Sequence, residues 1–293
     1  MRLQTTAEFP LSNVDTTTPY AGPHRWQISA GARLIRRALR HRTYTRWVNA
    51  YCDPFVVTGL ERIASLCGPA IFVANHQSHM DTLVLAEALP PRVRDNLYFG
   101  AAADRWFVRG RKKLELNPLY QSIVLGNFPV VRGGGAKSLD YARWLLQRGC
   151  NVCLFPEGTR ATDDELGPFK QGPALLALDA DVPVVPVYLS GLRGIRPKGA
   201  LRARRGAAGV HVLEPVRFVA DTPVVEATAQ LRAILSRRHA AERAYSRAIV
   251  RDALHDATRL AGSFDAASGA ARHLRLEGRV QSAGRVNRSS LRG

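Results

Sequence analysis

A histidine and an aspartate five residues apart are the first residues of this sequence that could do chemistry. His76 and Asp81 follow an apolar run over residues 70–74 that has the composition of a buried strand. A carboxylate bound to one ring nitrogen of a histidine fixes the tautomer and raises the basicity of the other nitrogen. That nitrogen could take a proton from a hydroxyl as the hydroxyl attacks an acyl carbonyl. The pattern favours His76 as a general base oriented by Asp81.

The same residues also have purely structural interpretations. Ser78 is a good N-cap for a helix over residues 81–89, and Ser78 and Asp81 have the spacing of a capping box, so Asp81 could simply hold the helix start. His76 could be a hydrogen-bonded histidine at a strand end. His79 lies three residues after His76 and suggests a metal pair, but no third ligand is evident and we expect no metal site.

A second block, residues 155–160, reads Phe-Pro-Glu-Gly-Thr-Arg and closes another apolar run. Gly158 permits a backbone angle that other residues avoid. Arg160 could hold a phosphate through two hydrogen bonds, and the backbone amides of Gly158 and Thr159 could add donors. The alternative is an ordinary Pro-Glu-Gly turn with a surface arginine.

Together the two blocks resemble the PlsC-like 1-acylglycerol-3-phosphate acyltransferases, a family of lysophospholipid acyltransferases. Two further segments are similar to motifs of that family: residues 126–132, which end at Arg132, and the apolar strand over residues 182–187. Residues 169–172 after the second block also fit. The resemblance covers roughly residues 58–219, and four blocks in the same order are far more specific than any single motif.

The resemblance implies transfer of a fatty acyl group to the hydroxyl of a lysophospholipid, giving phosphatidic acid when the acceptor is 1-acylglycerol 3-phosphate. It makes His76 the general base and Asp81 its orienting partner. The residues that it places in acceptor binding are Arg132, Glu157, Gly158, Thr159 and Arg160. The implied donor is an acyl thioester of CoA or acyl carrier protein, with no metal, no other cofactor and no covalent acyl-enzyme. Glycerol 3-phosphate or another lysolipid is an alternative acceptor, and a non-enzymatic membrane or nucleic-acid binder on the same scaffold is an alternative function.

Apolar runs alternate with helical patterns through the middle of the chain. Strand-like runs occupy residues 70–74, 151–155, 182–189 and 210–213. Helical patterns occupy residues 81–89, 136–147, 173–179 and 224 to about 260. This alternation predicts an α/β fold, a mixed β-sheet flanked by helices with sites at the strand ends, and the resemblance implies the glycerolipid acyltransferase-like form of it.

The cysteines do not suggest a metal or disulfide framework. They are Cys52, Cys67, Cys150 and Cys153. Cys150 and Cys153 lie three residues apart on a strand-like run, so their side chains should point to opposite faces of the sheet. We expect reduced thiols and no zinc site.

Arginines are concentrated near the N-terminus of this chain, whose net charge is +18. Between Thr16 and Cys52 there is no acidic residue, and the arginines there are Arg25, Arg33, Arg36, Arg37, Arg40, Arg42 and Arg46. The intervening apolar residues, which predict an amphipathic helix broken near residues 43–45, are Leu34, Ile35, Leu39, Trp47 and Val48. Such a helix could lie on an anionic membrane, with its arginines reaching the headgroups and Trp26 and Trp47 near the interface. A solvated helix packed by one face is the alternative. Nucleic-acid binding has no recognition motif to support it, so no nucleic-acid partner is expected.

We therefore expect three segments along the 293 residues. Residues 1–50 form a basic amphipathic arm, residues 51–260 an acyltransferase domain, and residues 261–293 a disordered tail rich in Arg, Gly and Ser. No apolar run reaches the length of about 18 residues that a spanning helix needs, and the first 20 residues lack the apolar core of a secretory signal. The expected location is cytoplasmic, peripheral at the inner face of the cell membrane.

Overall fold

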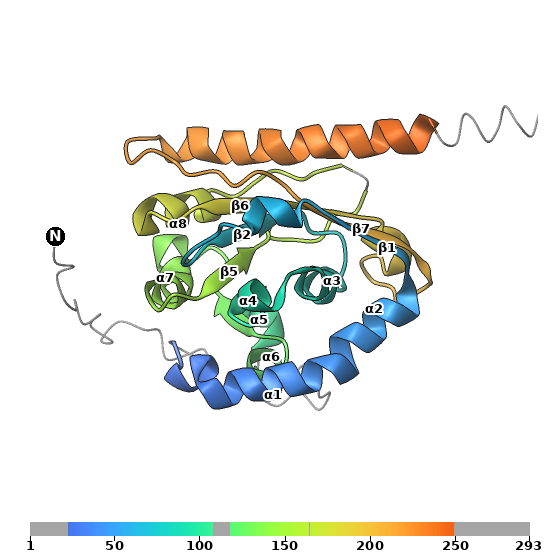
Figure 1. Cartoon of the computed structure of the whole chain (residues 1–293). Coiled ribbons are helices and arrows are strands. Elements are labelled where there is room, and N and C mark those ends of the chain that lie inside the picture. Colours follow the sequence, from blue (N-terminus) through green and yellow to red (C-terminus); the bar gives the residue numbers. More distant parts are fainter. Residues whose placement is uncertain (1–22, 108–117, 164, 249–293) are drawn as a thin grey trace, which may run out of the picture. The chain divides into compact units, whose positions relative to one another are not determined.

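The computed structural model describes residues 23–107, 118–163 and 165–248, in which strands and helices alternate (Figure 1). The strands are β1 (Cys52–Thr58), β2 (Ile71–Ala74), β3 (Leu97–Ala102), β4 (Asn127–Val130), β5 (Asn151–Leu154), β6 (Val184–Ser190) and β7 (Gly206–Val212). The α-helices are α1 (Ala30–Arg40), α2 (Arg46–Tyr51), α3 (Asp81–Ala88), α4 (Pro91–Arg94), α5 (Ala103–Trp106), α6 (Pro118–Ile123), α7 (Asp140–Gln147), α8 (Gly172–Ala180) and α9 (Leu192–Ile195). Residues 224–248 are also helical.

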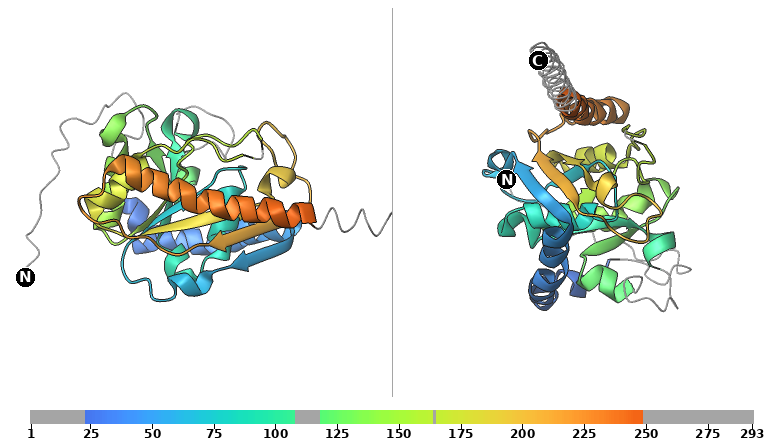
Figure 2. Two further views of the ribbon diagram at one scale, coloured as in Figure 1. Left: turned by 90° about the horizontal axis from the view of Figure 1, so that it is seen from above. Right: turned by 90° about the vertical axis from the view of Figure 1, so that its right-hand side faces the viewer.

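The strands form one mixed sheet in the order β1-β7-β6-β2-β5-β3-β4. The five strands from β6 to β4 run parallel, β7 is antiparallel to β6, and β1 lies beside β7 at one edge (Figure 2). The prediction of a mixed sheet flanked by helices is confirmed. Because parallel strands end at the same edge of a sheet, the segments that follow β2, β3, β4, β5 and β6 meet there.

Both faces of the sheet are covered, and the central strands alternate between two apolar clusters. In β2, Phe72 belongs to the cluster formed with α2 and α3, whereas Ile71 and Val73 belong to the cluster formed with α7 and α8. Cys153 belongs to the first of these clusters and Cys150 to the second, so the prediction that their side chains point to opposite faces is confirmed. All four cysteines are free thiols.

The sequence located β2, β5, β6 and part of β7, and it missed β1, β3 and β4. The order of the sheet explains two of these omissions, because β1 and β4 are its edge strands and carry Pro54 and Pro129. Proline removes a backbone donor and is tolerated mainly at sheet edges. Because proline is rare in strands, its presence argues against predicting a strand from residue propensities. The third, β3, ends in Gly100, Ala101 and Ala102, whose small side chains weaken the pattern.

The helix expected over residues 81–89 is present as α3, but Ser78 is not its N-cap. Met80 occupies the N-cap position. The Ser78 hydroxyl donates to the carbonyl of Arg196 at 2.7 Å and accepts a hydrogen bond from Met80 N at 3.2 Å. The prediction of Ser78 as the N-cap is therefore wrong in position, although its hydroxyl does bind a backbone N–H group at the start of the helix. Asp81 stabilises the turn before α3, because its carboxylate accepts hydrogen bonds from the backbone N–H groups of Gln77 and Ser78.

The arm that precedes the sheet is a continuous helical rod in which a π turn, residues His41–Thr45, joins α1 to α2 (Figure 1). The expected break near residues 43–45 is this π turn. The side chains buried against the body recur every fourth position and are Ala32, Arg36, Arg40, Tyr44 and Val48. A π turn takes more residues per turn than an α-helix, so it slows the rotation of the buried face and helps keep this stripe in register.

The chain divides into two units at His239. In the first unit the helical residues 224–239 place Ala227, Leu231 and Leu235 in the apolar cluster of α7 and α8. In the second unit residues 240–248 are helical. The expected tail, residues 261–293, lies outside the described residues. Within the described part of the chain, no helix combines the length and apolar character needed to cross a bilayer.

Candidate active site

His76 and Asp81 form a hydrogen-bonded pair at the carboxyl end of β2. His76 Nδ1 and Asp81 Oδ2 are 2.7 Å apart, and the Asp81 side chain is fully buried while 22% of the His76 side chain is exposed. The His76 ring also stacks on Phe155, with ring centroids 4.3 Å apart. With Nδ1 engaged by the carboxylate, Nε2 is left to accept a proton from a ligand.

The structure is compatible with both interpretations of Asp81, as a residue that holds the helix start and as the partner of His76. Its carboxylate accepts a hydrogen bond from Gln77 N at 2.7 Å and from Ser78 N at 2.9 Å, in addition to its contact with His76. These bonds fold the segment between strand and helix back on itself. The capping role and the orienting role are therefore one arrangement, since the turn that Asp81 closes is the turn that brings His76 to it.

Hydrogen bonds from the segment around residues 155–161 hold the backbone of His76 in place. Glu157 Oε1 accepts a hydrogen bond from His76 N at 2.8 Å, and Ala161 N donates to the carbonyl of His76 at 2.8 Å. The other Glu157 oxygen accepts from Gly167 N at 3.2 Å. Burial raises the pKa of Glu157, although the two N–H donors oppose that shift. Glu157 was expected to bind or position the acceptor; the contacts of its carboxylate are with the backbone on either side of the site.

Gly158 adopts a backbone conformation that favours glycine. Its φ is +66°, in the left-handed region. A Cβ atom there would lie 2.8 Å from Cε of Lys170, whose flexible side chain would have to move aside. Gly158 and Thr159 line the same pocket as His76, and Lys198 Nζ donates weakly to Thr159 Oγ1 at 3.4 Å.

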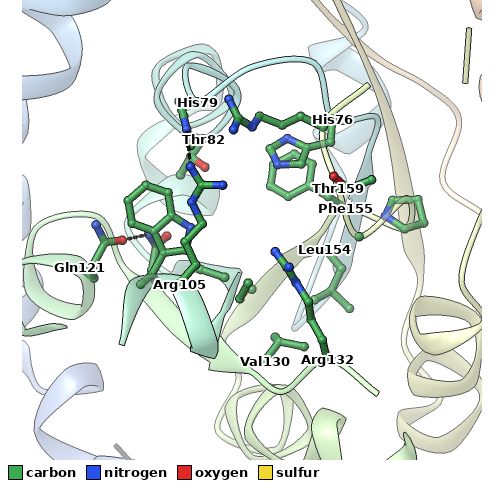
Figure 3. Close-up of a pocket in the computed structure, with 18 of the residues that line it drawn as sticks. His76, His79, Thr82, Arg105, Gln121, Val130, Arg132, Leu154, Phe155 and Thr159 are labelled. Carbon is green, nitrogen blue, oxygen red and sulfur yellow. Dashed lines mark hydrogen bonds between the residues drawn. The ribbon is translucent and has the colours of Figure 1, made fainter. Parts of the chain in front are cut away.

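A pocket of about 900 Å³ opens in front of His76 (Figure 3). Part of its wall is apolar, including Leu83, Ala101, Val130, Leu154 and Leu175. Its basic lining residues are Arg42, Arg105, Arg132, Arg160, Lys170, Arg196 and Lys198. Among the described residues that line it there is no aspartate or glutamate. The pocket therefore joins apolar surface to a strongly positive surface around one imidazole.

Arg160 is the basic residue that is most deeply buried at this site. It is 6% exposed, and among the described residues its Nη1 has no hydrogen-bond partner. Burial and the neighbouring charges of Arg105 and Arg196 lower its pKa, while Asp81 opposes them. Arg132 lies on another side of the pocket, about half exposed, with its Nη1 3.5 Å from an Asp104 oxygen. The structure thus brings all the predicted site residues to one edge of the sheet.

Three residues that line this pocket were not considered in the sequence argument: Arg105, Arg196 and Lys198. Arg105 follows β3, which the sequence did not reveal, and Arg196 follows β6 after a short helix. A signal was present, because charged residues shortly after a parallel strand tend to reach the site edge. His79 also lines the pocket, and its Nε2 lies 3.3 Å from Arg105 Nη2. Within the described ranges there is no group of three or more potential metal ligands.

Comparison with known proteins agrees with this geometry. The family model described as Acyltransferase matches residues 54–190 of the chain. That span holds most of β1 and all of β2 to β6, and therefore the strand ends that carry His76, Arg132 and Arg160. Residues 54–190 of the chain are therefore similar to this family of acyltransferases.

The chain is also similar to individual proteins and to a solved structure. The chain is 28% identical over 215 residues to the 1-acyl-sn-glycerol-3-phosphate acyltransferase BAT2, chloroplastic, of Brassica napus, with 71% of this chain and 56% of the relative covered. It is 33% identical over 162 residues to the 1-acyl-sn-glycerol-3-phosphate acyltransferase alpha of Homo sapiens, with 53% and 52% covered. The crystal structure of the LPA acyltransferase PlsC from Thermotoga maritima superimposes with a TM-score of 0.53 and 26% identity, over 70% of this chain and 77% of that one. Over these regions the chain is similar to 1-acyl-sn-glycerol-3-phosphate acyltransferases and to PlsC, and it spans about half the length of the curated relatives it matches.

Proposed function

We propose that this protein is a peripheral membrane O-acyltransferase that moves a fatty acyl group from an acyl thioester to the free hydroxyl of 1-acylglycerol 3-phosphate, giving phosphatidic acid. The observation that carries the proposal is the orientation of His76. Its Nδ1 is bound to a buried carboxylate and its ring borders a pocket with apolar and basic walls. The names of the relatives point to the same acceptor.

The reaction needs one proton to move twice. His76 Nε2 takes the proton of the acceptor hydroxyl as the oxygen attacks the thioester carbonyl, and Asp81 stabilises the imidazolium that forms. The tetrahedral intermediate then collapses, so that the carbon–oxygen ester bond remains and the carbon–sulfur bond breaks. His76 returns its proton to the departing thiolate of CoA or acyl carrier protein. No metal and no covalent acyl-enzyme is required.

The two kinds of pocket surface suit the two ends of the acceptor. A phosphomonoester carries close to two negative charges at neutral pH and is favoured by arginine pairs. The apolar wall suits acyl chains, whose burial contributes about 0.8 kcal/mol for each CH₂ group. A lysolipid without a phosphate would leave the positive charge of Arg160 and its neighbours uncompensated. The basic lining therefore favours a phosphate-bearing acceptor.

We further propose that the arm docks the enzyme on the inner face of the cell membrane. Its outward side exposes large apolar residues, with Leu34 64% and Ile35 48% exposed, together with Leu39, Trp47 and Trp26. Arg37, Arg42 and Arg46 are exposed on the same rod and suit anionic headgroups, which are abundant on the cytoplasmic leaflet. Arg36 and Arg40 instead point into the protein, so the expectation that all the arginines reach lipid headgroups is corrected for these two.

The activity is tested by acyl transfer from oleoyl-CoA to lysophosphatidic acid, with release of free thiol followed together with product. Wild type should form phosphatidic acid and His76→Ala should lose nearly all of that rate. Circular dichroism and thermal unfolding of both proteins provide the control for folding. Equal rates for wild type and His76→Ala across several lysolipids and acyl lengths would contradict the proposal.

Docking is tested separately by flotation of the full chain with liposomes that contain anionic lipid. The double variant Leu34→Ser/Leu39→Ser should float less than wild type. Leu201→Ser is the matched control, because Leu201 is 94% exposed and lies outside the arm. If the arm variant floats as well as the control, the arm is not the docking element, whatever the outcome of the activity assay.

A further inference from the structure

We propose that Arg105 is a phosphate-binding residue of this pocket and that His79 and Trp106 position it, an inference that rests on the proposed function. The ligand class is a phosphomonoester, carried either by the lipid acceptor or by the nucleotide end of a CoA thioester. Arg105 lies outside the four sequence blocks that resemble the family. It enters the site only because β3 ends beside β5, the strand that leads to Glu157 and Arg160.

The Arg105 guanidinium is held from two directions. Nη2 lies 3.3 Å from Nε2 of His79, and the guanidinium carbon lies 5.3 Å from the centre of the Trp106 ring. Trp106 in turn meets the edge of the His79 ring, with centroids 5.3 Å apart and planes at 88°. Figure 3 shows the Arg105 side chain extended to His79, to which the dashed hydrogen bond runs, with His76 on the other side of the open space. The side chains of His79 and Trp106 thus direct the Arg105 guanidinium.

The partner of Arg105 is neutral. Burial, followed by the charges of Arg160, Arg105, Arg196 and His76, lowers the pKa of His79 to about 3. At neutral pH His79 therefore accepts a hydrogen bond from Arg105 without cancelling its charge. Arg132 gives the contrast, because a carboxylate oxygen of Asp104, the residue before Arg105 on helix α5, lies 3.5 Å from it and compensates its charge in part.

Arg105 lines the pocket together with Arg160 and Arg196, and no aspartate or glutamate is among the described lining residues. Arg105 and Arg196 both lower the pKa of Arg160, and Asp81 raises it. Nη1 of Arg160 and Nε of Arg196 have no hydrogen-bond partner among the described residues. Holding like charges together in a partly buried pocket costs free energy, and a dianion placed among them removes that cost. The donors left free on Arg160 and Arg196, together with Arg105, match the oxygens of a phosphate.

Calorimetric titration of the full chain tests the binding step without requiring turnover. The probes are glycerol 3-phosphate, which represents the acceptor head group, and adenosine 3′,5′-bisphosphate, which represents the nucleotide end of CoA. Arg105→Met should weaken one of them by about tenfold or more, because hydrogen bonds to charged groups contribute on that scale. Arg217→Met is the matched control: it removes one exposed arginine outside the pocket lining and should leave both affinities unchanged.

The role of His79 is tested by steady-state kinetics on three variants. His79→Gln keeps a neutral acceptor and should retain the KM of wild type for the phosphate-bearing substrate. His79→Leu removes the acceptor and should raise that KM severalfold with kcat preserved. His79→Glu keeps an acceptor but neutralises Arg105, so it should raise KM further still. A merely structural histidine would give no such order, and its loss would lower stability and kcat together.

The outcomes separate this inference from the proposed function. If Arg105→Met weakens glycerol 3-phosphate, the phosphate is that of the acceptor; if it weakens the bisphosphate, the phosphate is that of the donor, and either result supports the site. Should wild type transfer no acyl group yet bind a probe through Arg105, the proposed function fails and the phosphate site stands. Binding of neither probe by wild type, or unchanged affinities in Arg105→Met, overturns the inference.

Discussion

Arg40 in the arm and Arg160 beside the pocket are both 6% exposed, but their surroundings are opposite. Arg40 contacts the carboxylates of Glu87 and Asp95 and donates to the carbonyl of Ala86. Arg160 has an Nη1 with no partner in the described part of the chain and has arginines nearby. Burial alone therefore does not distinguish the two. The presence or absence of a carboxylate partner does, and it separates an arginine that holds the fold from one that we propose binds a ligand.

Arg36 is a second buried arginine of the arm; its Nη1 also has no hydrogen-bond partner among the described residues, but its other two nitrogens are bonded to the protein. It donates through Nε to the carbonyl of Ile123 at 3.0 Å and through Nη2 to the carbonyls of Gln27 and Ser122. Its guanidinium also lies over the Tyr98 ring at 4.6 Å from the centroid. These arginines attach an amphipathic rod to the body by its charged side and so leave apolar side chains outward.

The largest effect is expected on the pocket side of the comparison. Asp81→Asn should lower kcat by roughly 10³–10⁴, because an amide cannot hold the histidine tautomer or stabilise the imidazolium as a carboxylate does. The free energy of unfolding should fall much less, by about 1–2 kcal/mol, through the weaker acceptor offered to Gln77 N and Ser78 N. Steady-state rates and urea unfolding measure the two effects. A loss of rate no greater than the loss of folded protein would contradict the orienting role.

Arg40→Met tests the arm side. It leaves two partly buried carboxylates, Glu87 and Asp95, without this partner, and the free energy of unfolding should fall by about 3 kcal/mol. Activity on detergent-dispersed substrate should stay close to that of wild type. Arg37→Met is a sharp control, because Arg37 bonds the same Asp95 at 2.6 Å but is 65% exposed, and its loss should cost less than about 1 kcal/mol. Equal destabilisation by the two variants would remove the distinction.

Arg160→Met should have the opposite effects to Arg40→Met: it should lower activity and leave stability unchanged or higher. Loss of its charge relieves repulsion with Arg105 and Arg196, so we expect the free energy of unfolding to stay level or to rise. The value of kcat/KM for a phosphate-bearing acceptor should nevertheless fall by roughly 10–100-fold, the scale of a lost hydrogen bond to a charged group. A strongly destabilised Arg160→Met protein would place this residue with Arg40 instead.

The smallest effect concerns His79 and pH. Its pKa is about 3 in the folded protein, below the ordinary value of 6.5, and the charged or titratable groups that face it are Arg160, Arg105, Arg196 and His76. Below about pH 6.5 the unfolded chain binds a proton at His79 that the folded chain does not, so stability falls as pH falls. His79→Gln removes this contribution. Its stability relative to wild type should rise by roughly 1 kcal/mol between neutral pH and about pH 5, after allowance for solvent screening of a partly exposed ring.

Urea unfolding of both proteins at the two pH values measures that difference. The comparison of variant with wild type cancels the contributions of the other titrating groups. A constant difference between the two proteins would mean that His79 titrates alike in the folded and unfolded chains, contrary to its placement among the arginines.

Much of the fold could be predicted from the sequence because its central strands are nearly pure apolar runs. The strands that carry prolines or small residues at the sheet margins could not, since local propensity there disagrees with the pairing that tertiary structure imposes. The residues of the site fall into the same two groups, those that the sequence revealed and those that it did not. His76, Asp81 and Arg160 lie in contiguous blocks whose spacing carries information, whereas Arg105 and Arg196 reach the pocket only through the arrangement of β3 and β6.

The arm shows a second limit of sequence reasoning. Its pattern of arginine and apolar residues correctly predicted an amphipathic helix, but not which side faces the protein. The usual assumption places apolar residues inward. Here Arg36 and Arg40 find carbonyl and carboxylate partners on the body, and Leu34 and Ile35 face outward. Those partners lie 40 to 100 residues away in the sequence, so no local pattern could identify them.

The most direct test of the central claim is acceptor discrimination by the wild-type protein. Initial rates of transfer from oleoyl-CoA are compared for 1-oleoylglycerol 3-phosphate and for 1-oleoylglycerol, which differ only in the phosphate. If the uncompensated arginines exist to hold that phosphate, wild type should prefer the phosphorylated acceptor by about 100-fold in kcat/KM, and Arg160→Met should lose most of that preference. Equal use of both acceptors by wild type, or full preference retained by Arg160→Met, would contradict the account.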